Sequence, residues 1–117
     1  MGNTVEEVRR EIRWISSVLT DSIIKASARY TELKERLRKI DKNRQGDLYA
    51  LYEHDLALVE DYIMRASVIK SLLEALDTAI TNGRDVRGLL DILYEERRAI
   101  PEFLWSIEWI VDTLRGA

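Results

Sequence analysis

The side chains that most often carry out catalysis or hold metals are scarce in this sequence. There is no cysteine, and His54 is the only histidine, so nucleophile–base pairs and the usual zinc sites lack their components. Carboxylates gather at Glu95-Glu96 and between Asp55 and Asp61, but no E-x-x-H pattern accompanies them, as a di-metal site in a helical bundle requires. Glycine-rich phosphate-binding motifs are also absent. We therefore expect no enzyme, no catalytic residue, no metal and no cofactor.

Charge is the more informative chemistry of this chain. The 117 residues carry a net charge of −3. Residues 1–45 hold 11 Lys/Arg and 7 Asp/Glu, whereas residues 46–117 hold 7 Lys/Arg and 14 Asp/Glu, so the two parts carry +4 and −7. This division permits attraction within one molecule, between neighbouring molecules, or to an anionic surface.

A long amphipathic helix is predicted over residues 4–42. Thr4 and Glu7 form a capping box at its start. Steps of three and four residues keep its apolar side chains within a stripe about 100° wide. These side chains are Ile12, Ile15, Leu19, Ile23, Ala26, Tyr30, Leu33, Leu37 and Ile40. Such a helix is about 58 Å long, too long for a compact globule of this size to cover. It therefore needs a second long helix, a neighbouring molecule, or both.

A second long helix is predicted from Asp47 to about Asn82, after a short polar break that contains Gly46. Asp47 is a suitable N-cap, and Asn82-Gly83 is a stop signal. Its apolar stripe is Leu48, Leu51, Val59, Ile63, Ala66, Ile69, Leu73, Leu76 and Ile80. Because the connection is short, the two helices should be antiparallel neighbours. The prediction is a helical hairpin over residues 4–82.

Two shorter helices are predicted over residues 84–98 and 101–115, the second opened by Pro101. The fold class is therefore all-α: a long antiparallel hairpin with two shorter helices packing back on it, in one domain spanning residues 1–117. No apolar run reaches the roughly 20 residues that cross a bilayer, and the start lacks the apolar core of a signal peptide. We expect a cytoplasmic protein.

Three tryptophans are candidate anchors for a partner chain. In the last helix, Phe103, Ile107, Ile110 and Leu114 share one face, which should dock on the hairpin. Trp105 and Trp109 point roughly the opposite way. Large aromatic side chains are common interface anchors, although a sandwiched helix would bury both faces. Trp14 also lies off the apolar stripe, where it could pack on the last helix, meet a neighbour or lie at a membrane surface.

The basic side chains of the first helix are candidates for binding an anionic membrane. Lys25, Arg29 and Arg36 fall on one flank, and three others lie more nearly opposite the apolar stripe: Arg10, Arg13 and Lys39. Glutamates are interleaved with them, so a solvated helix with pairs such as Glu32–Arg36 remains an alternative. The same glutamates and the acidic balance argue against nucleic acid.

Several local motifs occur in a distinctive order after the basic helix. They are the segment Gly46-Asp47-Leu48-Tyr49-Ala50-Leu51-Tyr52-Glu53-His54-Asp55-Leu56, then Leu72-Leu73-Glu74-Ala75-Leu76-Asp77-Thr78-Ala79, then Asn82-Gly83-Arg84-Asp85-Val86 with Leu89-Leu90, and Ile100-Pro101-Glu102 with Ile107-Glu108. In this order the chain resembles the core of ESCRT-III proteins, especially the archaeal cell-division (CdvB-like) proteins, over about residues 10–115.

The resemblance implies a function. Proteins of this family polymerise side by side on anionic membrane and help to constrict or sever it, in cell division or membrane scission. The implied partners are further copies, in dimers or filaments, related ESCRT-III subunits, and the membrane surface. The basic flank would meet lipid headgroups, and the last helix would be a movable latch. The family's proline-containing tail, which binds an ATPase, is not among these 117 residues. The alternative is a helical-bundle self-association or adaptor protein with no membrane role.

Overall fold

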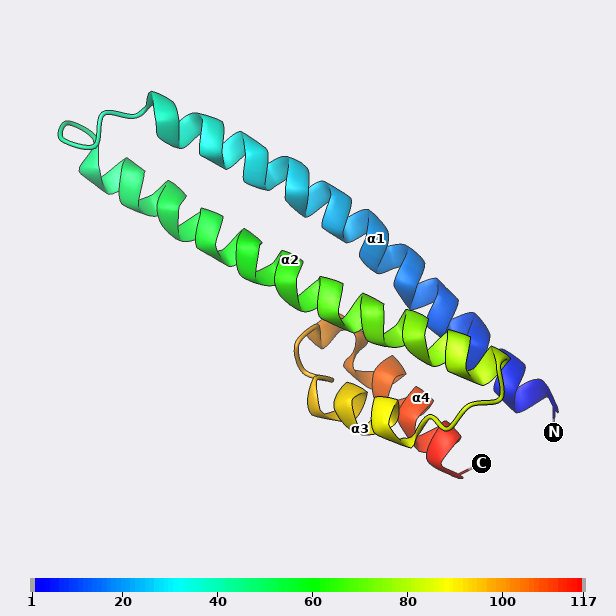
Figure 1. Cartoon of the computed structure of the whole chain (residues 1–117). Coiled ribbons are helices and arrows are strands. Elements are labelled where there is room, and N and C mark those ends of the chain that lie inside the picture. The colour runs from blue at the N-terminus through cyan, green and yellow to red at the C-terminus, as the bar shows by residue number, and fades with distance from the viewer. Residues whose placement is uncertain (1, 117) are drawn as a thin grey trace.

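Two long antiparallel helices form the body of the molecule, and two short ones pack at one end (Figure 1). The structure, a computed structural model, describes residues 2–116. Its elements are α1 (Gly2–Lys39), α2 (Gly46–Thr81), α3 (Arg87–Glu95), the 3₁₀ helix η1 (Pro101–Phe103) and α4 (Leu104–Gly116). The principal extents are 64 × 21 × 20 Å. The predicted all-α hairpin with two shorter helices is confirmed, and α1 and α2 pair within one chain.

The boundaries of α1 differ from the prediction at both ends. The helix begins at Gly2, so Thr4 lies inside it and the predicted capping box is wrong. It ends at Lys39 rather than near residue 42. The reason is a tight turn at Asp41, whose carbonyl oxygen accepts hydrogen bonds from the backbone N–H groups of Arg44 (3.1 Å) and Gln45 (2.8 Å). This turn brings α2 back along α1.

The end of α2 follows the stop signal in the sequence. Gly83 has φ +65°, the left-handed conformation that glycine adopts without a steric penalty. The N–H of Gly83 donates to Ile80 O at 3.2 Å, and the N–H of Arg84 donates to Ala79 O at 2.9 Å. These two bonds form a Schellman motif. At the other end the N-cap is Gln45 rather than Asp47, since α2 begins at Gly46.

The third helix is shorter than the predicted range of 84–98. Before it, Asp85 accepts hydrogen bonds from the Arg87 guanidinium and from the backbone N–H of Arg87, and these lower the pKa of Asp85 to about 2. After it, Ile100 is extended, with φ −124° and ψ 88°, as a residue before proline prefers. Pro101 then opens η1, which leads directly into α4.

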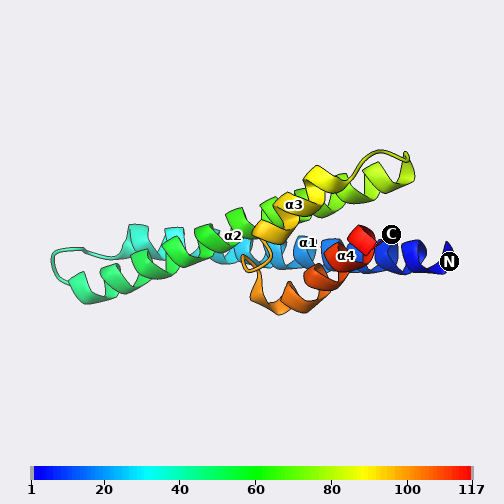
Figure 2. The same ribbon diagram turned by 90° about the horizontal axis from the view of Figure 1, so that it is seen from below.

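The hydrophobic core lies at one end of the hairpin. All four α-helices contribute to it, and Figure 2 shows α3 beside α2 and α4 beside α1 over only part of their length. The buried members are Val8, Ile12, Ile15, Leu19, Ala66, Ile69, Leu73, Leu76, Leu90, Leu93, Ile100, Phe103, Ile107, Ile110 and Val111. From residue 20 to residue 65, Leu33 is the one buried side chain. We call residues 24–61 the distal arm.

The distal arm exposes part of the apolar stripe of α2. Leu48 and Leu51, which the spacing of apolar residues puts on that stripe, are exposed, Leu51 to 54%. Leu58, seven residues after Leu51, is exposed to 56%. The same flank one and two heptads further on holds Arg65 and Leu72, and Leu72 packs against the core. These leucines are therefore exposed because α3 and α4 end before reaching them.

Within residues 2–116, no helix combines the length and the apolar character that a transmembrane span requires.

The core and the distal arm should respond differently to truncation of a leucine. Leu73 is fully buried, so Leu73→Ala should lower the free energy of unfolding by about 2–5 kcal/mol. Leu58→Ala makes the same chemical change in the same helix at an exposed position, and should change it by less than about 0.5 kcal/mol. Urea denaturation followed by circular dichroism measures both. Equal losses in the two variants would contradict an uncovered distal arm.

Candidate functional site

The six basic residues proposed from the sequence do not form one cluster. All six lie on α1, but they are distributed along most of its length. Arg10 and Arg13 are beside the core, Lys25, Arg29 and Arg36 are on the distal arm, and Lys39 is the last residue of the helix. All six are exposed. The structure brings together only the middle three, on one flank of the distal arm.

The apolar face of α1 continues beyond the part of the hairpin that the C-terminal segment covers. Ile15 and Leu33 are 18 residues apart, which is five turns of a helix, so they occupy the same angular position, and both are fully buried. Lys25, Arg29 and Arg36 lie about 40–80° to one side of that position at 100° per residue and are exposed. The three basic residues therefore flank the apolar face and do not replace it.

Two of these arginines are partly neutralised within α1. The Glu32 carboxylate lies 3.4 Å from Arg29 Nη1 and 2.7 Å from Arg36 Nη2. Arg36 Nη1 also donates to the Tyr52 hydroxyl of α2 at 3.4 Å. The Tyr52 hydroxyl, followed by Glu32, raises the pKa of Arg36 above its ordinary value. The predicted Glu32–Arg36 pair is thus present. Lys25 takes part in no ion pair with another described side chain.

The two helices of the distal arm carry opposite charge. Residues 24–39 of α1 hold six Lys/Arg and two Glu, a net of +4. Residues 46–61 of α2 hold five Asp/Glu and no Lys or Arg, a net of −5. The ion pairs found among the described residues here stay within a helix or within the connection, as in Arg38–Glu35 at 2.9 Å and Arg44–Asp41 at 3.7 Å. The two helices of the arm therefore differ in net charge and form no ion pair with each other, and we call the α1 side of the arm its basic edge and the α2 side its acidic edge.

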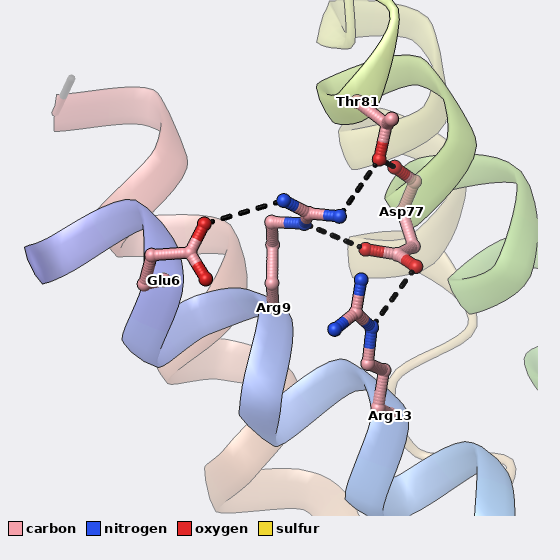
Figure 3. A network of polar contacts seen from close by, with 5 residues as sticks. All are labelled: Glu6, Arg9, Arg13, Asp77 and Thr81. Carbon is pink, nitrogen blue, oxygen red and sulfur yellow. Dashed lines mark hydrogen bonds and ion pairs between the residues drawn. The ribbon is translucent and has the colours of Figure 1, made fainter. Parts of the chain in front are cut away.

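Ion pairs between α1 and α2 occur at the other end of the hairpin (Figure 3). Asp77 accepts a hydrogen bond from Arg9 Nε at 3.1 Å and one from Arg13 Nε at 3.4 Å. Arg9 also donates to Thr81 Oγ1 at 2.9 Å. The hydrogen bond to Asp77 is the main cause of the raised pKa of Arg9. Arg13 is therefore committed to a contact within the chain. Nothing in the sequence alone indicates that Arg9 and Asp77 meet.

The three tryptophans gather where α1 and α4 meet. Trp14 packs edge-on against Phe103, with ring centroids 5.7 Å apart and an interplanar angle of 82°. Trp105 is exposed to 87% and Trp109 to 41%, whereas Ile107 on the other face is fully buried. The docking face of α4 is thus as predicted, and the alternative in which both faces are buried is wrong. Trp14 packs on the C-terminal segment and still exposes half of its surface.

A shallow open cleft lies between α1 and α4 beside these rings. It is lined by Glu11, Trp105, Ser106 and Trp109. Glu11 is half-buried and forms no ion pair with any described side chain. The cleft was not foreseen, because Glu11 could be placed beside the tryptophans only once the direction of α4 was known. We call these four residues the tryptophan cleft.

Compared with known proteins, the chain matches no family model, no curated protein and no solved structure. Function must therefore be inferred from its own residues and geometry. In the described part of the chain, no three His, Cys, Asp or Glu side chains are grouped so that they could hold a metal ion. The candidate interaction surfaces are the oppositely charged edges of the distal arm, its exposed leucines and the tryptophan cleft.

The contacts of Asp77 should act as a unit. Asp77→Asn and Arg9→Gln should each lower stability to urea, and the double variant should cost less than the sum of the two, because they remove one shared contact. Glu35→Gln breaks an exposed pair within α1 and should have almost no effect. Strict additivity of the Asp77 and Arg9 changes would contradict the contact.

Proposed function

We propose that this protein is a self-associating subunit of the ESCRT-III type, which assembles into filaments on anionic membrane in cell division or membrane scission. It would act in the cytoplasm as a peripheral membrane protein, alone or with related subunits. One observation supports the proposal above the others: the distal arm has a basic helix and an acidic helix that form no ion pair with each other among the described residues.

Such an arm favours side-by-side association of identical chains. When the basic edge of one arm lies against the acidic edge of the next, the pair still has one free edge of each sign: the acidic edge of the first copy and the basic edge of the second. A contact of this heterologous kind extends into an open filament unless its rotation closes a ring. The exposed leucines of α2, Leu51 and Leu58, lie on the arm and add apolar area that a neighbour can cover.

The membrane part of the proposal rests on the positive charge of α1. Residues 24–39 carry +4, and basic segments near an anionic bilayer gain favourable electrostatic energy that falls off within a Debye length. Lys25, Arg29 and Arg36 lie together on an uncovered flank and are the residues that we expect to meet headgroups. Arg13 is a weaker candidate, because it already contacts Asp77.

A second function, self-association without a membrane role, is favoured by one specific contact. Glu32 neutralises Arg29 and Arg36 within α1, which reduces the charge available for lipid. In that case the chain would be a helical-bundle scaffold or adaptor, and only the association between copies would remain.

Charge reversal on the two edges tests the association between copies. One variant replaces the basic residues of the arm with glutamate: Lys25, Arg29 and Arg36. A second variant replaces three acidic residues of the arm with lysine: Asp47, Glu53 and Glu60. Each variant alone should fail to assemble in light scattering and electron microscopy, because both of its edges carry the same sign. An equimolar mixture should assemble again, since every contact then joins opposite charges. Assembly of either variant alone, or none in the mixture, would refute edge-to-edge association.

Vesicle co-sedimentation separates the membrane proposal from its alternative. The protein should sediment with anionic vesicles at low salt and remain in solution with neutral ones, and the glutamate variant of Lys25, Arg29 and Arg36 should lose binding. The matched control reverses three arginines of the C-terminal segment: Arg84, Arg87 and Arg98. It changes the net charge by the same amount and should retain binding. Filaments without vesicle binding would leave the scaffold function standing and remove the membrane role.

A further inference from the structure

Lys and Arg side chains of this chain lie over or beside most of its tyrosine rings but over none of the described tryptophan rings. Four of the five tyrosine rings have a Lys or Arg side chain of the same chain over or beside them, at 3.9–5.8 Å from the ring centroid. They are Tyr30, Tyr49, Tyr52 and Tyr94. Within residues 4–116, no cation occupies the face of a tryptophan. Tryptophan is the better cation-binding ring, so the strongest acceptors of this kind are the ones left open.

The tryptophan cleft places a carboxylate beside two of these open rings. Glu11 of α1 and the pair Trp105 and Trp109 of α4 line the same hollow. Trp105 is exposed to 87%, and Glu11 has no cationic partner among the described side chains. A carboxylate next to an aromatic face is an arrangement that binds a guanidinium or ammonium group, through the charge and the ring quadrupole together.

The charged side chains that α4 and η1 carry near the cleft are negative, as Glu11 is. Spacings of four and three residues put Trp105, Trp109 and Asp112 on one face of α4, and Glu102 lies three residues before Trp105, in η1. Residues 101–114 contain no Lys or Arg. Three arginines flank this stretch in the sequence: Arg115 contacts Asp91 at 2.9 Å, Arg97 stacks on Tyr94, and Arg98 is exposed. The face is therefore aromatic and acidic, which favours a cationic partner and repels an anionic lipid surface.

We propose that the tryptophan cleft is a binding site for an arginine or lysine side chain of a basic segment in a partner protein. The side chain enters between α1 and α4, its charged head group near the Glu11 carboxylate and its stem against Trp105 and Trp109. The flanking carboxylates, Glu102 and Asp112, attract the rest of the basic segment. This site is separate from the charged edges of the distal arm, so it stands or falls independently of filament formation.

Nuclear magnetic resonance provides a direct test, because the three indole N–H groups give separate signals. The probe is tri-arginine amide, and the control peptide is tri-citrulline amide, which keeps the side-chain shape without the charge. Tri-arginine should shift the signals of Trp105 and Trp109 in a saturable way and that of Trp14 much less. Tri-citrulline should leave all three in place. Equal shifts with both peptides would overturn the proposal.

Variants distinguish the cleft from general attraction to an acidic protein. Glu11→Gln should weaken tri-arginine binding by about threefold to tenfold, in the range of a single partly buried charge contact, and Trp105→Ala should weaken it similarly. Glu53→Gln removes one exposed negative charge from the distal arm and should leave binding unchanged. Equal weakening by Glu53→Gln and Glu11→Gln would show that binding follows net charge only, and would overturn the site.

Two further measurements test the other possible occupants of the cleft, which are an anionic membrane and a second copy of the chain. Vesicles of anionic lipid should leave the fluorescence emission of a Trp14→Phe protein unshifted, whereas a blue shift would assign the cleft to a membrane and overturn the proposal. Size-exclusion chromatography with light scattering should give the same mass distribution for the wild type and Trp105→Ala at each concentration. Association that Trp105→Ala abolishes would instead assign the cleft to a second copy of the chain.

Discussion

The burial of apolar side chains at one end of the hairpin is the interaction on which the rest of the structure depends. The C-terminal segment supplies α3, η1 and α4, whose apolar faces reach only part of α1 and α2. Over that part the flank of α1 is apolar, with Val8 and Ile15 fully buried. Beyond it α1 exposes Arg29 and Arg36 beside its apolar face. A short cover on a long hairpin therefore leaves an arm whose side chains must either remain solvated or be covered by another molecule.

The electrostatics of that arm follow from the same division. At the covered end, Asp77 joins Arg9 and Arg13 across the two helices. On the arm, the charges are satisfied locally, by Glu32 and Glu35 within α1, and the net charges of the two helices stay opposite. Because exposed ion pairs within a helix contribute little stability, these charges contribute little to the stability of the fold. The opposite net charges of the two helices are the observation on which the proposed association between molecules rests.

The aromatic side chains are divided in a comparable way. The tyrosines lie along the helices and, apart from Tyr62, which packs against the core, each is accompanied by a cation of the same chain. The tryptophans gather at the junction of α1 and α4, and of the three only Trp14 has an aromatic contact, with Phe103. The distal arm and the tryptophan cleft thus offer chemically different surfaces: one charged and repetitive, the other aromatic and acidic. A subunit with both could assemble with copies of itself and still bind a different partner.

Local sequence determined most of the helices and several of their ends. The three- and four-residue spacing predicted both long helices, Gly83 predicted the end of α2 because it tolerates positive φ, and Pro101 marked the start of the last helical segment. The facing of Trp105 and Trp109 followed from helical periodicity alone. These features depend on interactions between residues close in the chain, so the sequence is sufficient for them.

Tertiary structure decided what those helices cover. Periodicity placed Leu51 on the apolar stripe, but its burial depends on how far α3 and α4 extend, and they do not reach it. Periodicity also could not predict that Arg9 pairs with Asp77, or that Glu11 lies beside Trp105 and Trp109. The residues in each of these contacts are 68 or more positions apart and meet only through the packing of whole helices. The sequence by itself determined which faces are apolar, basic or aromatic. Only the tertiary structure decided which of them remain open, because exposure depends on the length and direction of the neighbouring helix.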